Sequence, residues 1–364
     1  MRYNTKTFNT FNKDLKLEWE SLEDGNNPFS TYAFHKSIYE TNIKLKKKFY
    51  NPIIFCIYEL NGNIAAILPL EEFFSSKTLI FHGSEFADYC DFIFSKNIGL
   101  NSICLYIKDR ILKKYDLFLH SFEKDNEFLN ILSNISRHKF SWRYSKRFFI
   151  DKNDYQNYLQ MKKKFIKKNK KSIQKNKLSI RKISTLKEKL KYLSKHIEYK
   201  SIQYKLTNTR NPFKNERYKK LIIEILKNFS AKIDFYLLIF NSNVVSILIT
   251  FIEKNRLCYY QPSYIRNSNL ESPGKILMYM SIRIAEEKGV EFDFSTGDEN
   301  YKKLYSSDFK KINSFYLSEQ LIFNFFHLTY FWLFYYYKNR NLLRKINSII
   351  IKFKGFLFHK NKVF

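Results

Sequence analysis

The stretch SPGKILMYMSIRIAEEKGVEFDFSTGDENYKK, residues 272–303, decides the fold of this chain. Ser272 is a favourable N-cap residue, Pro273 suits the first turn of a helix, and Gly289 is typical of the position just after a helix end. The apolar spacing between them predicts one helix with one packed face. The EFDF run at 291–294 then predicts a buried strand that leads into a polar turn. A helix followed by a buried strand favours an α/β fold.

The start of that helix has the features of an anion-binding site. A helix N-terminus presents unpaired backbone N–H groups and the positive end of the helix dipole. Gly274 would let a ligand approach the backbone, and Lys275 adds a positive charge beside it. A helix start without any ligand has the same appearance, so the pattern by itself gives only candidates. The candidate binding residues are Ser272, Pro273, Gly274, Lys275 and Ile276.

Two hairpins of similar sequence indicate that the chain contains a repeat. In the first half, residues 53–60 and 64–70 are apolar runs joined by Asn-Gly-Asn. An Asn-Gly between apolar runs is a strong hairpin signal. In the second half, residues 233–240 and 244–252 are joined by Asn-Ser-Asn. Each hairpin is followed by a strand-like stretch, a helical segment and another strand, so we interpret the sequence as an internal duplication.

This duplication predicts a mixed α/β (α+β) fold built from two tandem domains. The length of 364 residues is sufficient for two domains. We expect a first domain at 1–150, a second at 151–320 that carries the anion site, and a helical tail at 321–364. A strand at 312–317 is expected to close the second domain.

The composition limits the class of protein. A hydrophobic fraction of 45% favours a packed core, and Lys+Arg 64 against Asp+Glu 34 gives a net charge of +30, which attracts polyanions of any kind. The four cysteines show neither a zinc pattern nor a disulfide framework, and Cys56 and Cys258 are expected in the core. The N-terminus has no apolar run typical of a signal peptide, so we expect the protein in the cytoplasm.

Two segments have open interpretations. Residues 158–187 are rich in lysine and contain no acid. They fit a solvated helix that bridges the halves, or a cationic rim for an anionic substrate. The tail combines an uncharged aromatic run at 321–337 with a basic stretch at 338–364. It fits peripheral contact with an anionic membrane at its inner face, or packing on the protein's own sheet, whereas the aromatic run is short for a membrane span.

The opening stretch as a whole resembles the signature of the CelD-like (cellulose biosynthesis) family of GNAT acetyltransferases, which is related to the Fem peptidyltransferases. The motifs that carry the resemblance are SPGKIL at 272–277, EKG at 287–289, FDFSTGDENYK at 292–302, NPF at 27–29 and DYCD at 88–91. The resemblance covers about residues 15–320.

The resemblance implies that acyl-CoA is a co-substrate and that no metal is needed. It places the pyrophosphate over the helix start at 272–274 and the thioester near a separation between the strands at 257–264 and 291–294. The loop before this helix has fewer glycines and basic residues than is usual in the superfamily. The first half has no such loop, so we expect it to be a degenerate copy that shapes the acceptor cleft.

Attack of an amine on a thioester needs a base for the amine and a proton donor for the leaving thiolate. The resemblance implies Asp293 as the base and Tyr301 as the donor, with Lys302 on the oxyanion or on an acceptor phosphate. Each of the three has a structural alternative: a buried carboxylate bonded to backbone, a packed ring and a surface lysine.

The acceptor site is expected between the two halves. Its candidate residues are Asp88, Tyr89, Asp91, Gln203, Tyr204 and Tyr260. The leading hypothesis is an acyl-CoA-dependent N-acyltransferase that acts on an amino sugar or a surface-polysaccharide precursor. Two alternatives are Fem-like aminoacyl transfer from charged tRNA and a non-catalytic scaffold that binds anionic lipid or nucleic acid.

Overall fold

The computed structural model describes residues 3–47, 50–73, 77–265, 269–306 and 308–320. The strands are β1 (Tyr3–Phe8), β2 (Pro52–Glu59), β3 (Ile64–Glu72), β4 (Thr78–Phe81), β5 (Ile93–Phe94), β6 (Asp116–Glu123), β7 (His138–Ile150), β8 (Ser179–Ile183), β9 (Ile233–Phe240), β10 (Asn243–Glu253), β11 (Arg256–Tyr264), β12 (Glu291–Thr296) and β13 (Phe309–Ser318). The helices are α1 (Lys13–Leu22), α2 (Tyr32–Lys44), α3 (Leu100–Ile107), α4 (Glu127–Ile135), α5 (Tyr155–Met161), α6 (Lys163–Lys175), α7 (Leu186–Leu206), α8 (Glu216–Asn228), α9 (Pro273–Glu287) and α10 (Asn300–Tyr305). Short 3-10 turns lie at Pro28–Ser30, Pro212–Lys214 and Ser230–Lys232, and a π-helical turn at Lys108–Leu112.

Both predicted hairpins are confirmed. β2 pairs antiparallel with β3, and β9 pairs antiparallel with β10. The order then continues in the same way in each half. β3 pairs antiparallel with β4 and β4 parallel with β6, while β10 pairs antiparallel with β11 and β11 parallel with β12. A helix connects each parallel pair, so one strand–helix topology occurs twice, as the sequence repeat predicts.

Each half supplies its last strand to the other half. β7 follows β6 in the chain but pairs with β12, whereas β13 follows β12 but pairs with β6. β7 and β13 also pair with each other, from Phe309 opposite Phe148 to Ser318 opposite His138. The prediction that the strand at 312–317 closes the second domain is therefore wrong, because its partners are β6 and β7. The domain boundary at residue 150 stays a prediction.

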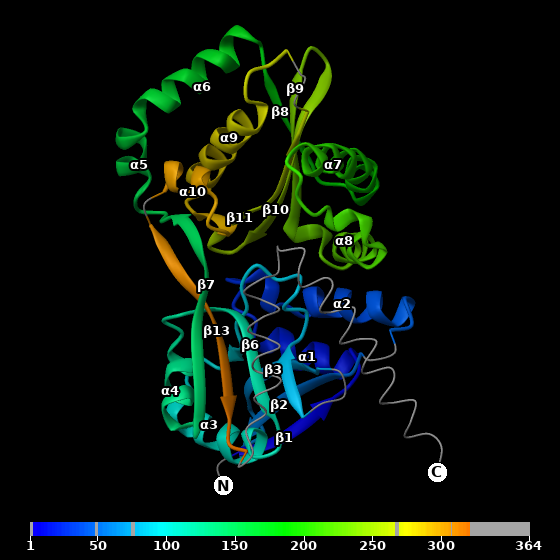
Figure 1. Ribbon diagram of the computed structural model, residues 1–364, viewed down its shortest axis with the longest axis vertical. Coiled ribbons are helices and arrows are strands. Elements are labelled where there is room, and N and C mark those ends of the chain that lie inside the picture. Colours follow the sequence, from blue (N-terminus) through cyan, green and yellow to red (C-terminus); the bar gives the residue numbers. More distant parts are fainter. Residues whose placement is uncertain (1–2, 48–49, 74–76, 266–268, 307, 321–364) are drawn as a thin grey trace. The chain divides into compact units, whose positions relative to one another are not determined.

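The strands β8 to β12 are covered on both faces. Figure 1 shows α9 on one face, and α7 and α8 on the other. The α9 face contains a buried core that includes Tyr259, Leu277 and Phe292. The core of the opposite face includes Leu193 and Phe251 and continues into the first half. Alternate residues of β11 thus point into two different cores, as the period of two in a strand requires.

The lysine-rich segment is more than one bridging helix. It forms α5, α6 and then β8, which pairs antiparallel with β9 at the edge of the sheet. In α6 the half-buried side chains, such as Phe165 and Ile173, lie on one side, and the lysines are exposed. The prediction of a single solvated helix is corrected by this strand, while the exposure of the α6 lysines agrees with it.

Cys56 and Cys258 are completely buried, as predicted for core residues. Within the described part of the chain, no helix has both the length and the apolar character needed to cross a bilayer. The predictions for the tail at 321–364 lie outside the described residues.

Candidate functional site

The parallel strands β11 and β12 separate in the middle of the second half. They pair only from Arg256 to Cys258 against Glu291 to Asp293, although β11 continues to Tyr264. The gap implied by the resemblance is therefore present beyond these three residue pairs. Beyond them β11 and β12 do not pair with each other, and the carbonyl oxygens of Ser295 and Thr296 at the end of β12 accept hydrogen bonds from Lys302 instead.

A β-bulge lies beside this separation. In the pairing of β10 with β11, Ile249 is opposite Gln261 and Thr250 is opposite Tyr259, so Tyr260 has no partner. A bulge redirects side chains and is common next to active sites. The ring of Tyr260 packs on Phe251 and Phe29, with its centre 4.9 Å from the ring centre of Phe251 and 6.0 Å from that of Phe29. Phe29 belongs to the NPF motif, which thus links the first half to the bulge.

The start of α9 has only part of the predicted anion-site character. Ser272 occupies the N-cap position with φ 55, but its side chain makes no capping hydrogen bond. Its carbonyl oxygen accepts hydrogen bonds from the amides of Lys275 at 2.9 Å and Ile276 at 3.2 Å. Pro273 and Ile276 are buried, so these two residues support the helix rather than offering side chains to a ligand. Ser272 and Lys275 are exposed, whereas Gly274 is half-buried against Tyr264.

Gly274 is required by the protein's own packing. A Cβ atom at this position would lie 2.8 Å from Cδ1 and 3.0 Å from Cε1 of Tyr264. The predicted close approach is therefore to a ring of β11. We expect Gly274→Ala to lower the free energy of unfolding by about 1–3 kcal/mol, because the ring must move. Gly99→Ala is the matched control, since its Cβ would meet only Ser102 at 3.8 Å. Equal denaturant midpoints for the two variants would contradict this explanation.

Asp293 lies at the centre of a buried charge cluster. The residue is 0% exposed, and its Oδ2 accepts hydrogen bonds from Arg147 at 2.9 Å and Tyr89 at 2.8 Å. Nε of Arg256 is 3.8 Å from the same oxygen, and the amide of Ser295 donates to Oδ1 at 2.7 Å. Both carboxylate oxygens are therefore occupied.

This environment does not suit a general base. Burial would raise the pKa of the Asp293 carboxyl, but the guanidinium groups of Arg147 and Arg256 outweigh it and hold the pKa below its usual range. A carboxylate with a lowered pKa and no free oxygen is a poor proton acceptor. This geometry favours the structural alternative for Asp293, which is a buried carboxylate held by hydrogen bonds.

Lys302 is also used internally. It is 3% exposed, and its Nζ donates to the carbonyl oxygens of Thr296 at 2.6 Å and Ser295 at 3.3 Å. It forms an ion pair with Glu299 at 3.2 Å. Ser295 has φ 61, a conformation that costs energy in a non-glycine residue. Lys302 therefore stabilises the turn after β12, and its ammonium is not directed at an acceptor.

Asp88 is the carboxyl that best fits an acid–base role. It is partly buried, and its Oδ1 is 3.5 Å from Oγ1 of Thr296, just beyond the end of the β11–β12 pairing. Burial raises the pKa of the Asp88 carboxyl to about 6, against the lowering effect of Lys302. A pKa near neutrality is typical of a catalytic acid or base. The sequence motifs predict Asp88 for the acceptor site and do not indicate an acid–base role.

Tyr301 keeps its proton near neutral pH. Burial, followed by the charges of Glu299 and Asp88, raises the pKa of its phenol, which makes the hydroxyl a weaker acid than that of an ordinary tyrosine. Tyr301 lies in α10 after β12 and packs against the core of the α9 face, whereas Tyr260 packs against the core of the opposite face. A shared site for Asp88, Tyr260 and Tyr301 stays a prediction.

One face of α7 lines the same region. His196 lies 3.3 Å from the side-chain oxygen of Gln261, and Gln203 donates to the carbonyl oxygen of Tyr264 at 3.1 Å. Gln203 is thus used to hold α7 on β11. Nζ of Lys200 lies 5.5 Å from the ring centre of Tyr204, which is partly buried. Lys200 was missed in the sequence because nothing distinguishes it from the many other lysines.

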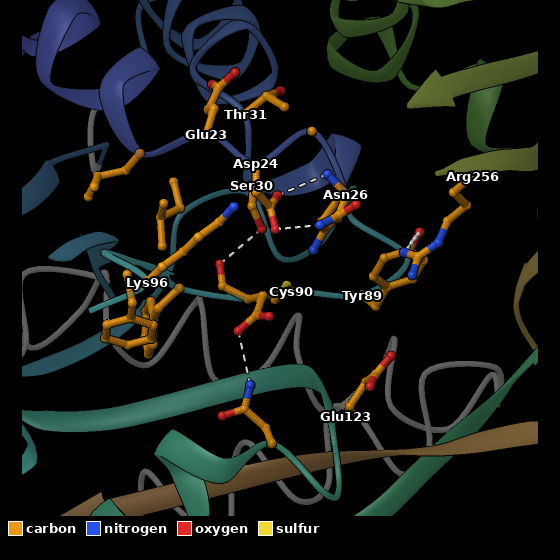
Figure 2. Close-up of a pocket in the computed structure, with 18 of the residues that line it drawn as sticks. Glu23, Asp24, Asn26, Ser30, Thr31, Tyr89, Cys90, Lys96, Glu123 and Arg256 are labelled. Atoms are coloured by element: carbon orange, nitrogen blue, oxygen red, sulfur yellow. Dashed lines mark hydrogen bonds between the residues drawn. The ribbon is translucent and has the colours of Figure 1, made fainter. Parts of the chain in front are cut away.

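Tyr89 and Asp91 do not line this region but a separate pocket of about 260 Å³. Figure 2 shows Glu23, Asp24 and Ser30 along one wall and Tyr89 beside Arg256 along another. Tyr89 is nearly buried and its hydroxyl is used by Asp293, so a role in acceptor binding is not supported for it.

Asp91 gives the pocket a pH-dependent charge. Its Oδ1 accepts a hydrogen bond from Asn126 at 2.9 Å, and burial raises the pKa of its carboxyl to about 7. A raised pKa means that the folded state binds the proton more tightly, so Asp91 lowers the stability progressively as pH rises from about 4 to about 7.

We expect Asp91→Asn to raise the melting temperature at pH 8 by roughly 2–4 °C, and to change it little at pH 4.5, where the folded wild type is already neutral at this position. Thermal unfolding followed at both pH values checks this. The same shift at both pH values would show that the charge of Asp91 is not the cause.

Comparison with known proteins agrees with this architecture. Residues 162–303 match the family described as "Acetyltransferase (GNAT) domain". FemX superposes with a TM-score of 0.58 at 10% identity, covering 86% of this chain and 98% of that chain. L-PGS from Bacillus licheniformis gives 0.53 at 8% identity, covering 87% and 95%. A conserved protein of unknown function from Bacteroides thetaiotaomicron gives 0.56 at 11% identity, covering 86% and 99%.

Residues 162–303 are therefore similar to GNAT acetyltransferase domains, and the chain has the GNAT fold. Identities this low show a shared fold and nothing finer. No curated protein matches the sequence.

Proposed function

We propose that this protein is an acyl-CoA-dependent N-acyltransferase, with its reaction site where β11 and β12 separate. The observation that carries the proposal is the separation of β11 and β12, with a bulge at Tyr260 of β11 and with the Asp88 carboxyl 3.5 Å from Thr296 at the end of β12. An acyl-CoA would place its thioester against the unpaired edge of β11 and its pyrophosphate near Gly274 and Lys275. Bound there, it supplies the activated acyl group.

In this proposal each of four side chains has a separate role. Asp88 accepts a proton from the attacking amine, because its carboxyl titrates near neutrality. Tyr301 donates a proton to the departing sulfur, because its hydroxyl stays protonated. Asp293 positions Tyr89 and the two arginines, and Lys302 holds the turn after β12. The acceptor, by resemblance to the CelD-like family, is an amino sugar or a surface-polysaccharide precursor.

Thermal unfolding with acetyl-CoA, longer acyl-CoAs and free CoA tests the cofactor site. We expect acetyl-CoA at 100 times its Kd to stabilise the protein by about 2.7 kcal/mol. Lys275→Glu reverses an exposed charge at the start of α9 and should weaken this shift. Lys288→Glu makes the same change just beyond the other end of that helix, where Lys288 is also exposed, and should leave the shift unchanged. No shift with any CoA species would refute the proposal.

Aminoacyl transfer from tRNA is the second candidate, and the exposed lysines of α6 favour it. Counterion release predicts that such binding weakens steeply with salt. Filter binding of uncharged tRNA between 50 and 200 mM salt separates the candidates. Aminoacyl transfer is supported if tRNA binding depends steeply on salt and if this dependence is lost when Lys164, Lys167 and Lys171 are changed to glutamine. An affinity that these changes leave intact would argue against it.

A further inference from the structure

Tyr218 of α8 connects the strand separation with the segment that carries Asp88. Its hydroxyl accepts a hydrogen bond from the side-chain amide of Gln261, which lies on β11 beyond the residues that pair with β12. Its ring packs on that of Phe86, with the ring centres 6.1 Å apart, and Phe86 is two residues before Asp88. The Asp88 carboxyl lies 3.5 Å from the hydroxyl of Thr296 at the end of β12. Direct contacts therefore lead from β11 through Tyr218 to Asp88 and on to β12.

The preceding residue, Arg217, fixes the start of α8 on the same segment. Its guanidinium forms an ion pair with Glu85 and donates to the side-chain oxygen of Asn42 at 2.7 Å. The guanidinium also lies 4.9 Å from the ring centre of Phe86. The position of Tyr218 beside Asp88 thus depends on contacts from two consecutive residues.

The hydrogen bonds of Gln261 have a defined direction. Nε2 of His196, a completely buried residue, lies 3.3 Å from the side-chain oxygen of Gln261. An amide oxygen only accepts hydrogen bonds and an amide nitrogen only donates them. His196 therefore donates to Gln261, and Gln261 donates to Tyr218. The hydroxyl of Tyr218 keeps its own hydrogen for another acceptor.

Tyr260, the residue at the bulge of β11, completes this group. Its hydroxyl is hydrogen-bonded to Gln261 and to Tyr218. The amide nitrogen can use both of its hydrogens on the two hydroxyl oxygens, and one hydroxyl can donate to the other. One hydroxyl hydrogen is then left for an acceptor outside the group. Tyr218 and Tyr260 are both half-buried, so a ligand can reach this hydrogen.

We infer that Tyr218 is a specificity-determining residue that selects amines with an oxygen on the neighbouring carbon. The inference rests on the proposed function. When such an acceptor binds, the hydroxyl pair of Tyr218 and Tyr260 donates its remaining hydrogen to that oxygen, while Asp88 receives the proton of the amine. The hydrogen bond orients the acceptor and takes no part in the transfer of the acyl group.

The surroundings of Tyr218 favour an uncharged oxygen over an anionic group. Its ring packs on Phe86 and on Phe213, whose ring centre is 5.2 Å away. The adjacent guanidinium of Arg217 is already paired with Glu85, so an anion would gain little from it. A hydroxyl or ether oxygen needs no counter-ion. The acceptor class is therefore the vicinal amino alcohols, to which 2-amino sugars belong.

The test compares two amines that differ by one hydroxyl group, trans-2-aminocyclohexanol and cyclohexylamine. Acetylation of each is measured with the wild type and with Tyr218→Phe, so that differences in basicity between the amines cancel. We expect the variant to lower kcat/KM for the amino alcohol by about 10–100-fold, because the oxygen of the acceptor loses its donor. For cyclohexylamine, which has no such oxygen, kcat/KM should change by less than about threefold.

Two further variants separate this role from a purely structural one. Gln261→Glu keeps the Tyr218 hydroxyl but offers it a carboxylate, which only accepts and so takes the hydroxyl hydrogen. We expect the same selective loss for the amino alcohol. Tyr106→Phe is the matched control, because it removes a hydroxyl that contacts Thr5 in the first half at 2.8 Å. It should leave both rates unchanged.

The outcomes distinguish failure of this inference from failure of the proposed function. If the wild type acetylates an amine but Tyr218→Phe does not selectively slow the amino alcohol, the inference is wrong and the proposed function stands. If the wild type acetylates neither amine, the proposed function fails and the inference fails with it.

Discussion

Replacing Arg147 with methionine is expected to destabilise the fold by about 3–5 kcal/mol, because it removes the nearer of the two guanidinium groups beside a buried carboxylate. Arg147 is 0% exposed and lies on β7, and its guanidinium contacts Asp293 and Glu291 at 2.9 Å and Glu123 at 3.2 Å. These acids come from β12 and β6, so the arginine joins strands of both halves. Chemical denaturation of the variant and of the wild type under the same conditions measures the loss in the free energy of unfolding.

The control for this prediction is an exposed ion pair. Lys168 and Glu271 lie 2.7 Å apart with side chains 70% and 73% exposed. We expect Lys168→Met to produce no measurable change, since exposed pairs are screened by water and salt. Arg147→Met combined with Asp293→Asn should recover part of the stability, because the unpaired charge is gone. If the double variant is less stable than Arg147→Met by the full effect of Asp293→Asn alone, the two residues are not coupled.

Asp88→Asn is expected to lower the rate of acyl transfer by about 10²–10⁴-fold, the usual contribution of a positioned base. The wild-type kcat/KM should decrease about tenfold per pH unit below pH 6, because Asp88 must be deprotonated to accept a proton and burial raises its pKa to about 6. The variant should lack this limb of the pH profile.

Asp109→Asn is the matched control for activity. Asp109 is an exposed residue of the π-helical turn, and its carboxylate pairs with Lys113 at 3.0 Å. Its variant should keep both the rate and the acidic limb. A pH profile of Asp88→Asn that retains the limb near pH 6 would assign the base to another group.

Local signals in the sequence predict most of the strands and helices. The hairpin at 233–252 follows from two apolar runs and a short polar turn, and the start of α9 follows from Pro273 and Gly274. The exchange of β7 and β13 does not follow from such signals. Its pairs join residues far apart in the chain, such as Phe309 and Phe148, and no local pattern specifies a partner at that distance.

The same limit applies to the site residues, because local motifs identify candidates but not the charges that the fold brings next to them. Asp88, Tyr260 and Tyr301 are candidates because polar or aromatic residues in a recognisable motif are visible in the sequence. Asp293 has the same appearance, yet Arg147 and Arg256 reach it from other strands and turn it into a structural carboxylate. The sequence cannot reveal that pairing, because a carboxyl's role depends on which charges the fold brings next to it.

Release of free thiol from acetyl-CoA in the presence of a panel of amines, amino sugars included, tests the central claim most directly. We expect thiol release that requires both an amine and the wild-type Asp88, and we expect to recover the acetyl group as an amide of that amine. Stabilisation by acetyl-CoA without thiol release for any amine, or release that Asp88→Asn leaves unchanged, would contradict it.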